Sequence, residues 1–214
     1  LQSLDKRGDY KAGVLKVNVL RNDFKVRVAG TDLPTPFGFG GWIAMTRGER
    51  GEDVMMGDLV LLQDEVNPVM STVLDNGLEV TALHNHFFWD EPKVYYMHVH
   101  GIGTPGELAR KIKPALDLIG RASPSLSERA GKTDIVGSAL DTKALDAVVG
   151  ATCEQNGLVY KYTIGRDDLR VEEMGAVINA RMGLNTWAAF YGTDDLEVVA
   201  GDVAMLEGEL TAVL

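Results

Sequence analysis

The sequence predicts an α+β fold built from two tandem repeats, each a mainly antiparallel sheet with packed helices. The first observation behind this prediction is that strand-like and helix-like segments follow one another without strict alternation, which favours antiparallel over parallel sheets. The second is that one pattern of residues recurs along the chain at a constant displacement. With 214 residues, the chain is long enough to bury a substantial hydrophobic core.

The recurring pattern consists of the same residue types in the same order. "LKVNVLRNDFKV" reappears as "YKYTIGRDDLRV", and the matched pairs are Lys16/Lys161, Arg21/Arg166, Asp23/Asp168, Val26/Val171, Gly38/Gly183 and Trp42/Trp187. After a one-residue deletion, "GDLVLLQDEV" from Gly57 matches "GDVAMLEGEL" from Gly201, so Glu65 corresponds to Glu209. Because so many matches share one displacement, the pattern indicates a duplicated unit.

The duplication predicts the domain organisation. We expect a first repeat over residues 1–120, a linker over residues 121–140 and a second repeat over residues 141–214. The second repeat looks truncated at its C-terminal end, because only five residues follow Glu209, whereas Glu65 is followed by helices and two further strands. An unfinished sheet would leave an unpaired edge, so we expect the natural protein to continue, or this half to be completed in another way.

Alternating apolar and polar residues predict the strands of the first repeat. They are expected over residues 14–20, 23–29, 41–48, 53–63, 78–88 and 93–101. We expect the first two of these strands to form a hairpin, because the turn-forming residues "RND" lie between them.

Three helices are predicted, the first two of them from terminal signals and helical spacing. Residues 67–77 are expected to form a helix with Asn67 as its N-cap and a proline at the first helical position. Residues 104–120 begin with the capping-box pattern at Thr104 and carry apolar residues at helical spacing. Residues 141–150 predict a third helix, which leads into the second repeat.

Composition excludes some classes of partner. The net charge is −10 and the isoelectric point is about 4.8, so we expect no nucleic-acid partner, which would need a basic patch. The apolar stretches are too short to form a transmembrane segment. The single cysteine, Cys153, excludes an intrachain disulfide.

All four histidines lie within residues 84–100, as two His-x-His pairs. Residues two apart on a strand point to the same face, so each pair presents both imidazoles on one side. If the two strands pair antiparallel about the proline-containing turn between them, His84 faces His100 and His86 faces His98. The predicted register therefore brings four imidazoles to one patch.

This patch predicts a site for a divalent transition metal, with His84, His86, His98 and His100 as the candidate ligands. Imidazole nitrogen suits Zn, Cu, Fe and Ni, whereas Mg and Ca prefer oxygen, so we expect zinc, with copper as the alternative. A second interpretation needs no metal. In it, neutral imidazoles line a polar groove and hydrogen-bond an anion or a glycan.

Three further residues are candidates for a role in catalysis. Glu91 lies in the predicted turn, where it could be a fourth ligand or the general base for metal-bound water. Glu65 could be a base or a ligand-orienting carboxylate, or simply a favourable charge at a helix N-terminus. Tyr96 could donate a hydrogen bond at the cluster. Two functions follow: a zinc-type hydrolase, or a protein that sequesters or senses a metal without catalysis. The groove interpretation adds a third, a glycan- or anion-binding envelope protein.

The stretch "GDLVLLQDEVNPVMSTVLDNGLEVTALHNH" (57–86), followed by "EPKVYYMHVHG" (91–101), resembles the LppY/LpqO-type family of uncharacterised bacterial secreted proteins and lipoproteins. The resemblance spans nearly the whole chain. It implies two tandem copies and an exported protein that is periplasmic, secreted or on the cell surface, often with a lipid anchor. A lipid-attachment cysteine would have to precede Leu1. The resemblance implies no established activity.

Overall fold

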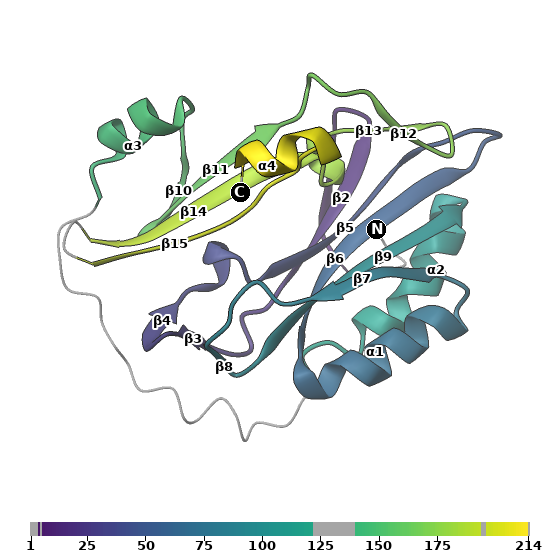
Figure 1. The fold of residues 1–214 in the computed structure, drawn as a ribbon. Coiled ribbons are helices and arrows are strands. Elements are labelled where there is room, and N and C mark those ends of the chain that lie inside the picture. Colours follow the sequence, from purple (N-terminus) through teal and green to yellow (C-terminus); the bar gives the residue numbers. More distant parts are fainter. Residues whose placement is uncertain (1–3, 5, 122–139, 194–195, 214) are drawn as a thin grey trace. The chain divides into compact units, whose positions relative to one another are not determined.

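The structure is a computed structural model, and it describes residue 4 and residues 6–121, 140–193 and 196–213. Strands and helices are mixed and the sheets are mainly antiparallel, which confirms the predicted α+β class (Figure 1). The predicted linker over residues 121–140 lies almost entirely outside the described residues. None of the described helices combines the length and the apolar character that crossing a membrane requires.

The chain divides into two compact units. The first comprises Leu1–Asp134 together with Glu172–Val177, and the second comprises Ile135–Val171 together with Ile178–Leu214. Each unit has its own main sheet.

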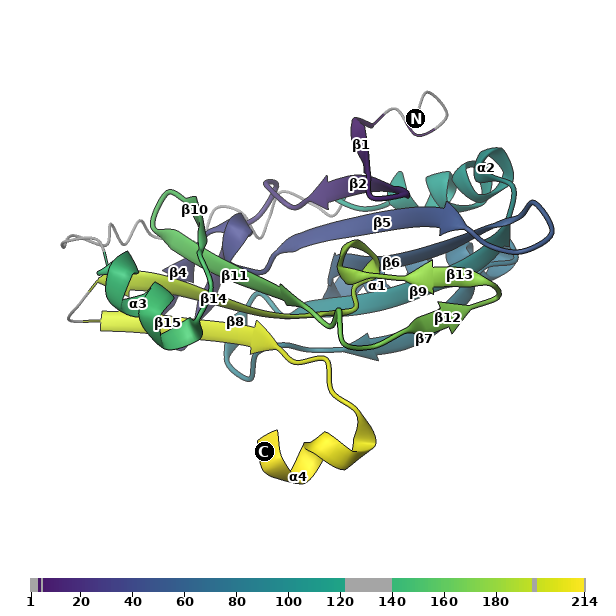
Figure 2. The same cartoon turned by 90° about the horizontal axis from the view of Figure 1, so that it is seen from above.

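The first unit is built on a six-stranded sheet with the order β1-β2-β5-β6-β9-β7. Its strands are β1 (Gly8–Lys11), β2 (Val14–Leu20), β5 (Gly40–Arg47), β6 (Asp53–Leu62), β9 (Val94–Gly103) and β7 (Glu79–His84). Strands β5, β6, β9 and β7 run side by side in Figures 1 and 2. A smaller sheet has the order β4-β3-β8, formed by β4 (Thr31–Leu33), β3 (Val26–Val28) and β8 (Asp90–Glu91), and the short 3-10 helix η2 (Thr35–Phe37) follows β4.

The predicted hairpin of residues 14–20 with residues 23–29 is wrong. Strand β2 pairs with β1 and β5, whereas β3 begins only at Val26 and pairs with β4 and β8. The physical reason is Arg21, which is 2% exposed and donates hydrogen bonds to carboxylate oxygens of Asp23 and Glu65. These contacts hold the chain after β2 in a bend and prevent a direct return.

Helices α1 (Gln63–Asp75) and α2 (Pro105–Leu116) contact each other and cover one face of the six-stranded sheet (Figure 1). The hydrophobic core lies between sheet and helices, and its members include Val17, Ile43, Met55, Leu59, Leu61, Val69, Val73, Met97, Val99, Leu108 and Ile112. The capping box predicted for α2 is confirmed. Thr104 Oγ1 accepts from the Glu107 N–H at 3.4 Å, and the Glu107 carboxylate accepts from the Thr104 N–H at 3.0 Å.

Helix α1 begins before the predicted N-cap, Asn67. Leu62 occupies the N-cap position and offers no side-chain acceptor, so the usual sequence signal is missing. Glu65 replaces it: its carboxylate accepts from the Leu62 N–H at 2.8 Å and from Arg21 Nη1 at 2.6 Å. A buried carboxylate thus satisfies a free N–H of the first turn and neutralises a buried cation.

The second unit contains a four-stranded sheet with the order β10-β11-β14-β15. Its elements are α3 (Thr142–Val149), β10 (Glu154–Asn156), β11 (Val159–Gly165), η4 (Ala180–Met182), β14 (Asn185–Thr193), β15 (Leu196–Asp202), η5 (Glu207–Glu209) and α4 (Leu210–Val213). Strands β12 (Val171–Glu173) and β13 (Ala176–Ile178) form a two-stranded sheet, and Glu172–Val177 within it belong to the first unit. The predicted helix over 141–150 is confirmed. Asp141 is its N-cap, and the Asp141 carboxylate accepts hydrogen bonds from the backbone N–H groups of Lys143 and Ala144. Gly150 ends the helix with a left-handed φ of 73°.

Candidate functional site

Strands β7 and β9 carry the histidines and pair antiparallel, but their register differs from the predicted one. The facing pairs include His84–Tyr96, Ala82–His98 and Glu79–His100, with a register shift between Val80 and Ala82. The predicted pairing of His84 with His100, and of His86 with His98, is therefore wrong.

The reason for the different register lies in the segment between the two strands. It does not form a tight turn, because Asp90 and Glu91 form β8, which pairs with β3 of the smaller sheet. The chain thus leaves the six-stranded sheet after His84 and returns at Val94. His86 consequently lies beyond the end of β7, where strand pairing no longer dictates its direction.

Three of the four imidazole rings still come together. The Nε2 atoms of His84 and His98 lie 3.2 Å apart, and their rings meet edge to face at 88°. The ring centroid of His86 lies 5.1 Å from that of His84. His100 has a different neighbour, since its Nδ1 lies 3.0 Å from Glu79 Oε2.

Tyr96 is a structural part of this cluster. Its ring stacks on His86 with centroids 3.5 Å apart and planes 8° apart, and its hydroxyl donates to the Gly38 carbonyl at 3.0 Å. The Tyr96 hydroxyl, which was predicted to donate a hydrogen bond at the cluster, therefore donates to the backbone instead. Burial raises the pKa of the Tyr96 hydroxyl, and the negative charges of Asp58 and Asp90 raise it further, so this phenol stays neutral.

Asp58 was not predicted as part of the site. It lies on β6 directly opposite His98, and its Oδ1 is 3.9 Å from His98 Nε2. Its side chain is 21% exposed and that of His98 is 41% exposed, so solvent reaches both groups. The only sequence signal was a single charged residue inside the apolar run "VMMGDLVLL", and the pairing of β6 with β9 gives it meaning.

The two predicted catalytic glutamates lie in other surroundings. Glu65 is buried and accepts hydrogen bonds from Arg21, Leu62 and Gly120. Glu91 is exposed on β8, opposite Arg27. We therefore assign Glu65 to the fold, where it fulfils the helix N-terminus alternative.

The loop that carries His86 is held by polar contacts. Asn85 Nδ2 donates to the Val94 carbonyl at 2.7 Å, and Asp90 Oδ2 accepts from the Val94 N–H at 2.8 Å. Phe87 packs on Phe39 with ring centroids 5.5 Å apart. These contacts fix the backbone on both sides of His86.

The cluster is not a complete metal centre. Within the part of the chain that the structure describes, no group of three or more His, Cys, Asp or Glu side chains is arranged to hold a metal ion. The His84–His98 pair supplies two nitrogen atoms directed at each other, and any third ligand has to move to join them.

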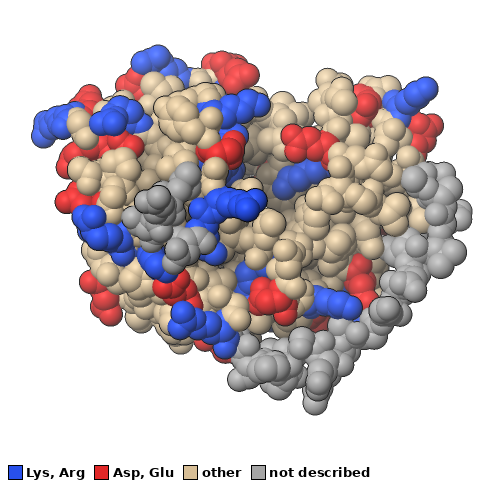
Figure 3. Space-filling model, turned by 180° about the vertical axis from the view of Figure 1, so that it is seen from behind, with Lys and Arg blue, Asp and Glu red and all other residues tan. Residues whose placement is uncertain are grey.

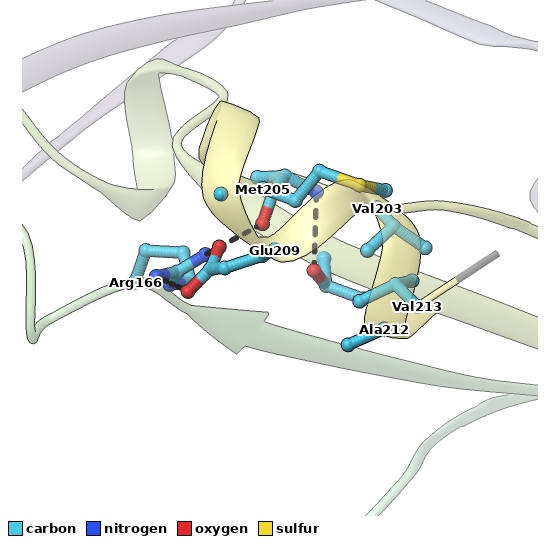
Figure 4. A pocket seen from close by; sticks show the side chains of 9 residues that line it. Arg166, Val203, Met205, Glu209, Ala212 and Val213 are labelled. Atoms are coloured by element: carbon cyan, nitrogen blue, oxygen red, sulfur yellow. Dashed lines mark hydrogen bonds and ion pairs between the residues drawn. The ribbon is translucent and has the colours of Figure 1, made fainter.

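A separate hollow of about 420 Å³ lies in the second unit, between the β15 end and α4 (Figure 4). It is lined by Arg166, Thr186, Val203, Ala204, Met205, Gly208, Glu209, Ala212 and Val213. Arg166 and Glu209 point toward each other there and are joined by hydrogen bonds of 2.8 and 2.9 Å. Since this arginine also donates to the Ala204 carbonyl and to Asp168, its donors are engaged within the unit.

The charges of the surface are mixed. On the face shown in Figure 3, Lys and Arg side chains alternate with Asp and Glu side chains. The absence of a nucleic-acid partner stays a prediction.

The fold and the site define an α+β protein with a cluster of imidazole rings on an antiparallel sheet. More particularly, a family model matches residues 1–118 and 143–214, and the chain belongs to that family, described as Domain of Unknown Function (DUF1259). No curated protein and no solved structure matches the chain.

Proposed function

We propose that the protein binds a divalent transition metal ion through His84 and His98, with zinc preferred and copper as the alternative. The observation that carries the proposal is the 3.2 Å separation of their Nε2 atoms. Two nitrogens that each lie about 2.0–2.1 Å from a tetrahedral zinc are about 3.3–3.4 Å apart. The pair thus already has nearly the spacing of two ligands on one ion.

Asp58 is the third ligand in this proposal. Its Oδ1 lies 3.9 Å from His98 Nε2, so a rotation of the carboxylate brings an oxygen toward an ion held by the pair. Side-chain rotations of this kind are common when a partner binds. Its negative charge also offsets that of the cation. Two imidazoles and one carboxylate form a donor set that zinc and other first-row metals accept.

The remaining two histidines take different roles. His86 is stacked on Tyr96 and lies beside His84, so it borders one side of the site. It is the candidate for a fourth ligand. His100 keeps Glu79 as its partner and stays outside the coordination sphere. The proposal therefore narrows the predicted four-histidine set to a pair with an adjacent carboxylate.

Whether the bound metal catalyses a reaction depends on its open positions. Because the side chain of His98 is 41% exposed, water reaches the ion beside it. With three protein ligands, a fourth position stays open for water, which zinc activates for hydrolysis; with His86 as a fourth ligand, the sphere closes and the protein sequesters or senses the metal. In the hydrolytic case, the carboxylate beside the ion is that of Asp58. Glu91, the predicted ligand or general base, lies on β8 of the smaller sheet.

A second function without metal is favoured by the absence, among the described residues, of an arranged set of three ligands. A distance of 3.2 Å also suits a hydrogen bond between two neutral imidazoles. In that case the cluster is the polar floor of a groove that binds a glycan or an anion.

Elemental analysis separates these functions. The protein is purified without a histidine tag and without chelator, and its metal content is measured by mass spectrometry before and after loading with Zn²⁺ or Cu²⁺. We expect one ion per chain, lost in His84→Ala and in His98→Ala. His100→Ala is the matched control, because it removes an imidazole from the same strand and should leave the metal content unchanged.

Spectroscopy of the Co²⁺-loaded protein then distinguishes catalysis from closure. A spectrum that changes on addition of a small anion indicates an open position, and one that does not change indicates a closed sphere. Metal content that is equal in the wild type and both Ala variants contradicts the proposal and favours the groove.

We also infer that the two units are copies of one ancestral unit. The network of Arg21, Asp23 and Glu65 recurs as Arg166, Asp168 and Glu209, with hydrogen bonds between the same atoms. Lys16 over Trp42 recurs as Lys161 over Trp187, with distances of 4.2 and 4.3 Å to the ring centroids. These correspondences support the tandem repeat that the sequence pattern predicts.

The cellular location is proposed from the resemblance to the LppY/LpqO-type family alone. It favours a protein that is exported and then secreted or held at the envelope. Fractionation of cells that express the natural gene tests this proposal, since we expect the protein outside the cytoplasmic fraction.

A further inference from the structure

Phe88 and Trp89 are large aromatic residues on the loop between β7 and β9, and both are exposed. Phe88 is 86% exposed and Trp89 is 72% exposed, and their ring centroids lie 5.8 Å apart. Aromatic rings normally contribute to stability by burial. Two adjacent rings left in solvent therefore form an apolar patch that suggests a ligand.

The backbone beneath these rings is fixed. The Trp89 carbonyl accepts from the Ala29 N–H at 3.1 Å, and the Phe88 carbonyl accepts from Lys93 Nζ at 2.8 Å. The next residues form β8, which pairs with β3. Because the backbone is already held, a ligand has to order only the side-chain torsions of the two rings.

The exposed rings adjoin the histidine cluster along the chain. His86 stacks on Tyr96, the next residue Phe87 packs on Phe39, and only then do Phe88 and Trp89 turn to solvent. The packing of Phe87 thus anchors the segment between the cluster and the rings. The patch therefore follows the cluster within three residues of the same loop.

The charges around the loop favour an uncharged ligand. The Lys93 ammonium is engaged by Asp90 and by the Phe88 carbonyl. Arg27, on the strand that pairs with β8, is held by Asp32 at 2.8 Å. Since both cations are engaged and the chain carries a net charge of −10, a polyanion or an anionic membrane would be repelled.

We propose that Phe88 and Trp89 form a stacking platform for the sugar rings of an uncharged polysaccharide. The apolar face of a pyranose ring suits an aromatic face, and its hydroxyls remain in water. The platform binds the polysaccharide by itself and does not depend on the proposed metal function.

Binding of the full chain to neutral polysaccharides tests the platform. The probes are cellulose, chitin, starch and mannan in pull-down assays, with cellohexaose and chitohexaose for titration calorimetry. We expect binding to at least one polysaccharide, and an affinity loss of about tenfold or more in the double variant Phe88→Ser/Trp89→Ser. Tyr10→Ser is the matched control, because Tyr10 is an aromatic residue of the same unit that is 74% exposed, and it should bind as the wild type does.

Three results would overturn the platform: binding to none of these polysaccharides, an equal affinity in the double variant, or an equal loss in the Tyr10 control. Vesicles of phosphatidylcholine, with and without phosphatidylglycerol, are the comparison. Binding to vesicles that needs the two rings, without binding to sugar, would assign the patch to membranes instead. The metal content of the double variant is measured in parallel, because an unchanged content shows that a failure of the platform leaves the metal proposal standing.

Discussion

The same arginine network stands in two very different surroundings in this protein. In the first unit, Arg21 contacts Glu65 at 2.6 Å, and the two side chains are 1% and 4% exposed. In the second unit, Arg166 contacts Glu209 at 2.8 Å, and the side chains are 15% and 40% exposed. Local sequence thus reproduces the geometry of an ion pair, but only the neighbouring elements decide how far water is excluded from it.

The neighbouring elements differ in a simple way. In the first unit, Glu65 lies in the first turn of the 13-residue helix α1, and β6 is followed in the sheet by β9 and β7. In the second unit, Glu209 lies in η5, the four-residue helix α4 follows, and β15 is the last strand of the described sheet. A helix and two strands therefore account for the burial of the first network.

The pKa values reflect this difference. Burial, which lowers the pKa of Arg21, is outweighed by hydrogen bonds and charge from Asp23 and Glu65, so the pKa is raised. For Arg166, the hydrogen bonds to Asp168 and Glu209 have the largest influence, exceed that of burial and raise the pKa. Both guanidinium groups stay charged. Only Arg21 is buried, so only there does the loss of a partner leave an uncompensated charge away from water.

The largest expected effect is that of Glu65→Gln. Among the described residues, this change leaves the buried Arg21 with Asp23 as its remaining anionic partner, so we expect a loss of about 3 kcal/mol in the free energy of unfolding. Glu209→Gln is the matched variant, and we expect a small fraction of that loss because water reaches the second pair. Urea unfolding gives the total, and peptide-resolved hydrogen exchange shows which unit is affected. Equal losses in the two variants would break the comparison.

A smaller loss is expected from Tyr96→Phe on β9. This change removes the part-buried hydrogen bond from the Tyr96 hydroxyl to the Gly38 carbonyl, which costs about 1 kcal/mol. Thermal unfolding measures the loss. Because the ring that stacks on His86 is kept, metal binding through His84 and His98 should be retained, and a lost metal content would show that the hydroxyl acts in the site.

A still smaller effect concerns pH. A hydrogen bond from Arg21 lowers the pKa of Asp23 below its usual 3.8, and one from Arg166 lowers that of Asp168. Each carboxylate thus contributes stability that is fully present above its unfolded pKa and is lost as the pH falls through the folded value. We expect Asp23→Asn and Asp168→Asn to lose this dependence when unfolding is measured from neutral pH to about pH 2. Only a larger change for Asp23, the partner of the buried arginine, fits the comparison.

The smallest effect should be the same in both units. Lys16→Met and Lys161→Met each remove an ammonium that lies over a tryptophan ring at 4.2 or 4.3 Å. At a partly exposed site this contact contributes about 0.5–1 kcal/mol. Denaturant unfolding of both variants checks it, and clearly unequal losses would show that the units differ beyond their ion pairs.

Elements with local signals could be predicted from the sequence. Helix α2 begins at the predicted capping box of Thr104, and α3 lies within the predicted range 141–150. The start of α1 could not be predicted in this way, since its cap comes from Glu65 inside the helix and from Arg21, which is distant in sequence.

The candidate site was predicted in its residue types and missed in its register. Alternation alone places His98 and His100 on one face of a strand. It cannot show that residues 90–91 pair with β3 and thereby shift β7 against β9. The role of Asp58 likewise depends on the pairing of β6 with β9, a non-local contact that no short motif records.

Strand β7 lies at the border of the six-stranded sheet and touches only β9 within it. His84 belongs to this edge strand and His98 to its inner neighbour. An ion bound by both histidines would therefore cross-link β7 to β9 and hold the edge strand in place. A slip by one residue would turn His84 to the opposite face and release the ion. Metal binding and the opening of β7 are then coupled, because the ion binds only while β7 is paired with β9. Slow amide exchange along β7 would indicate the metal-bound form.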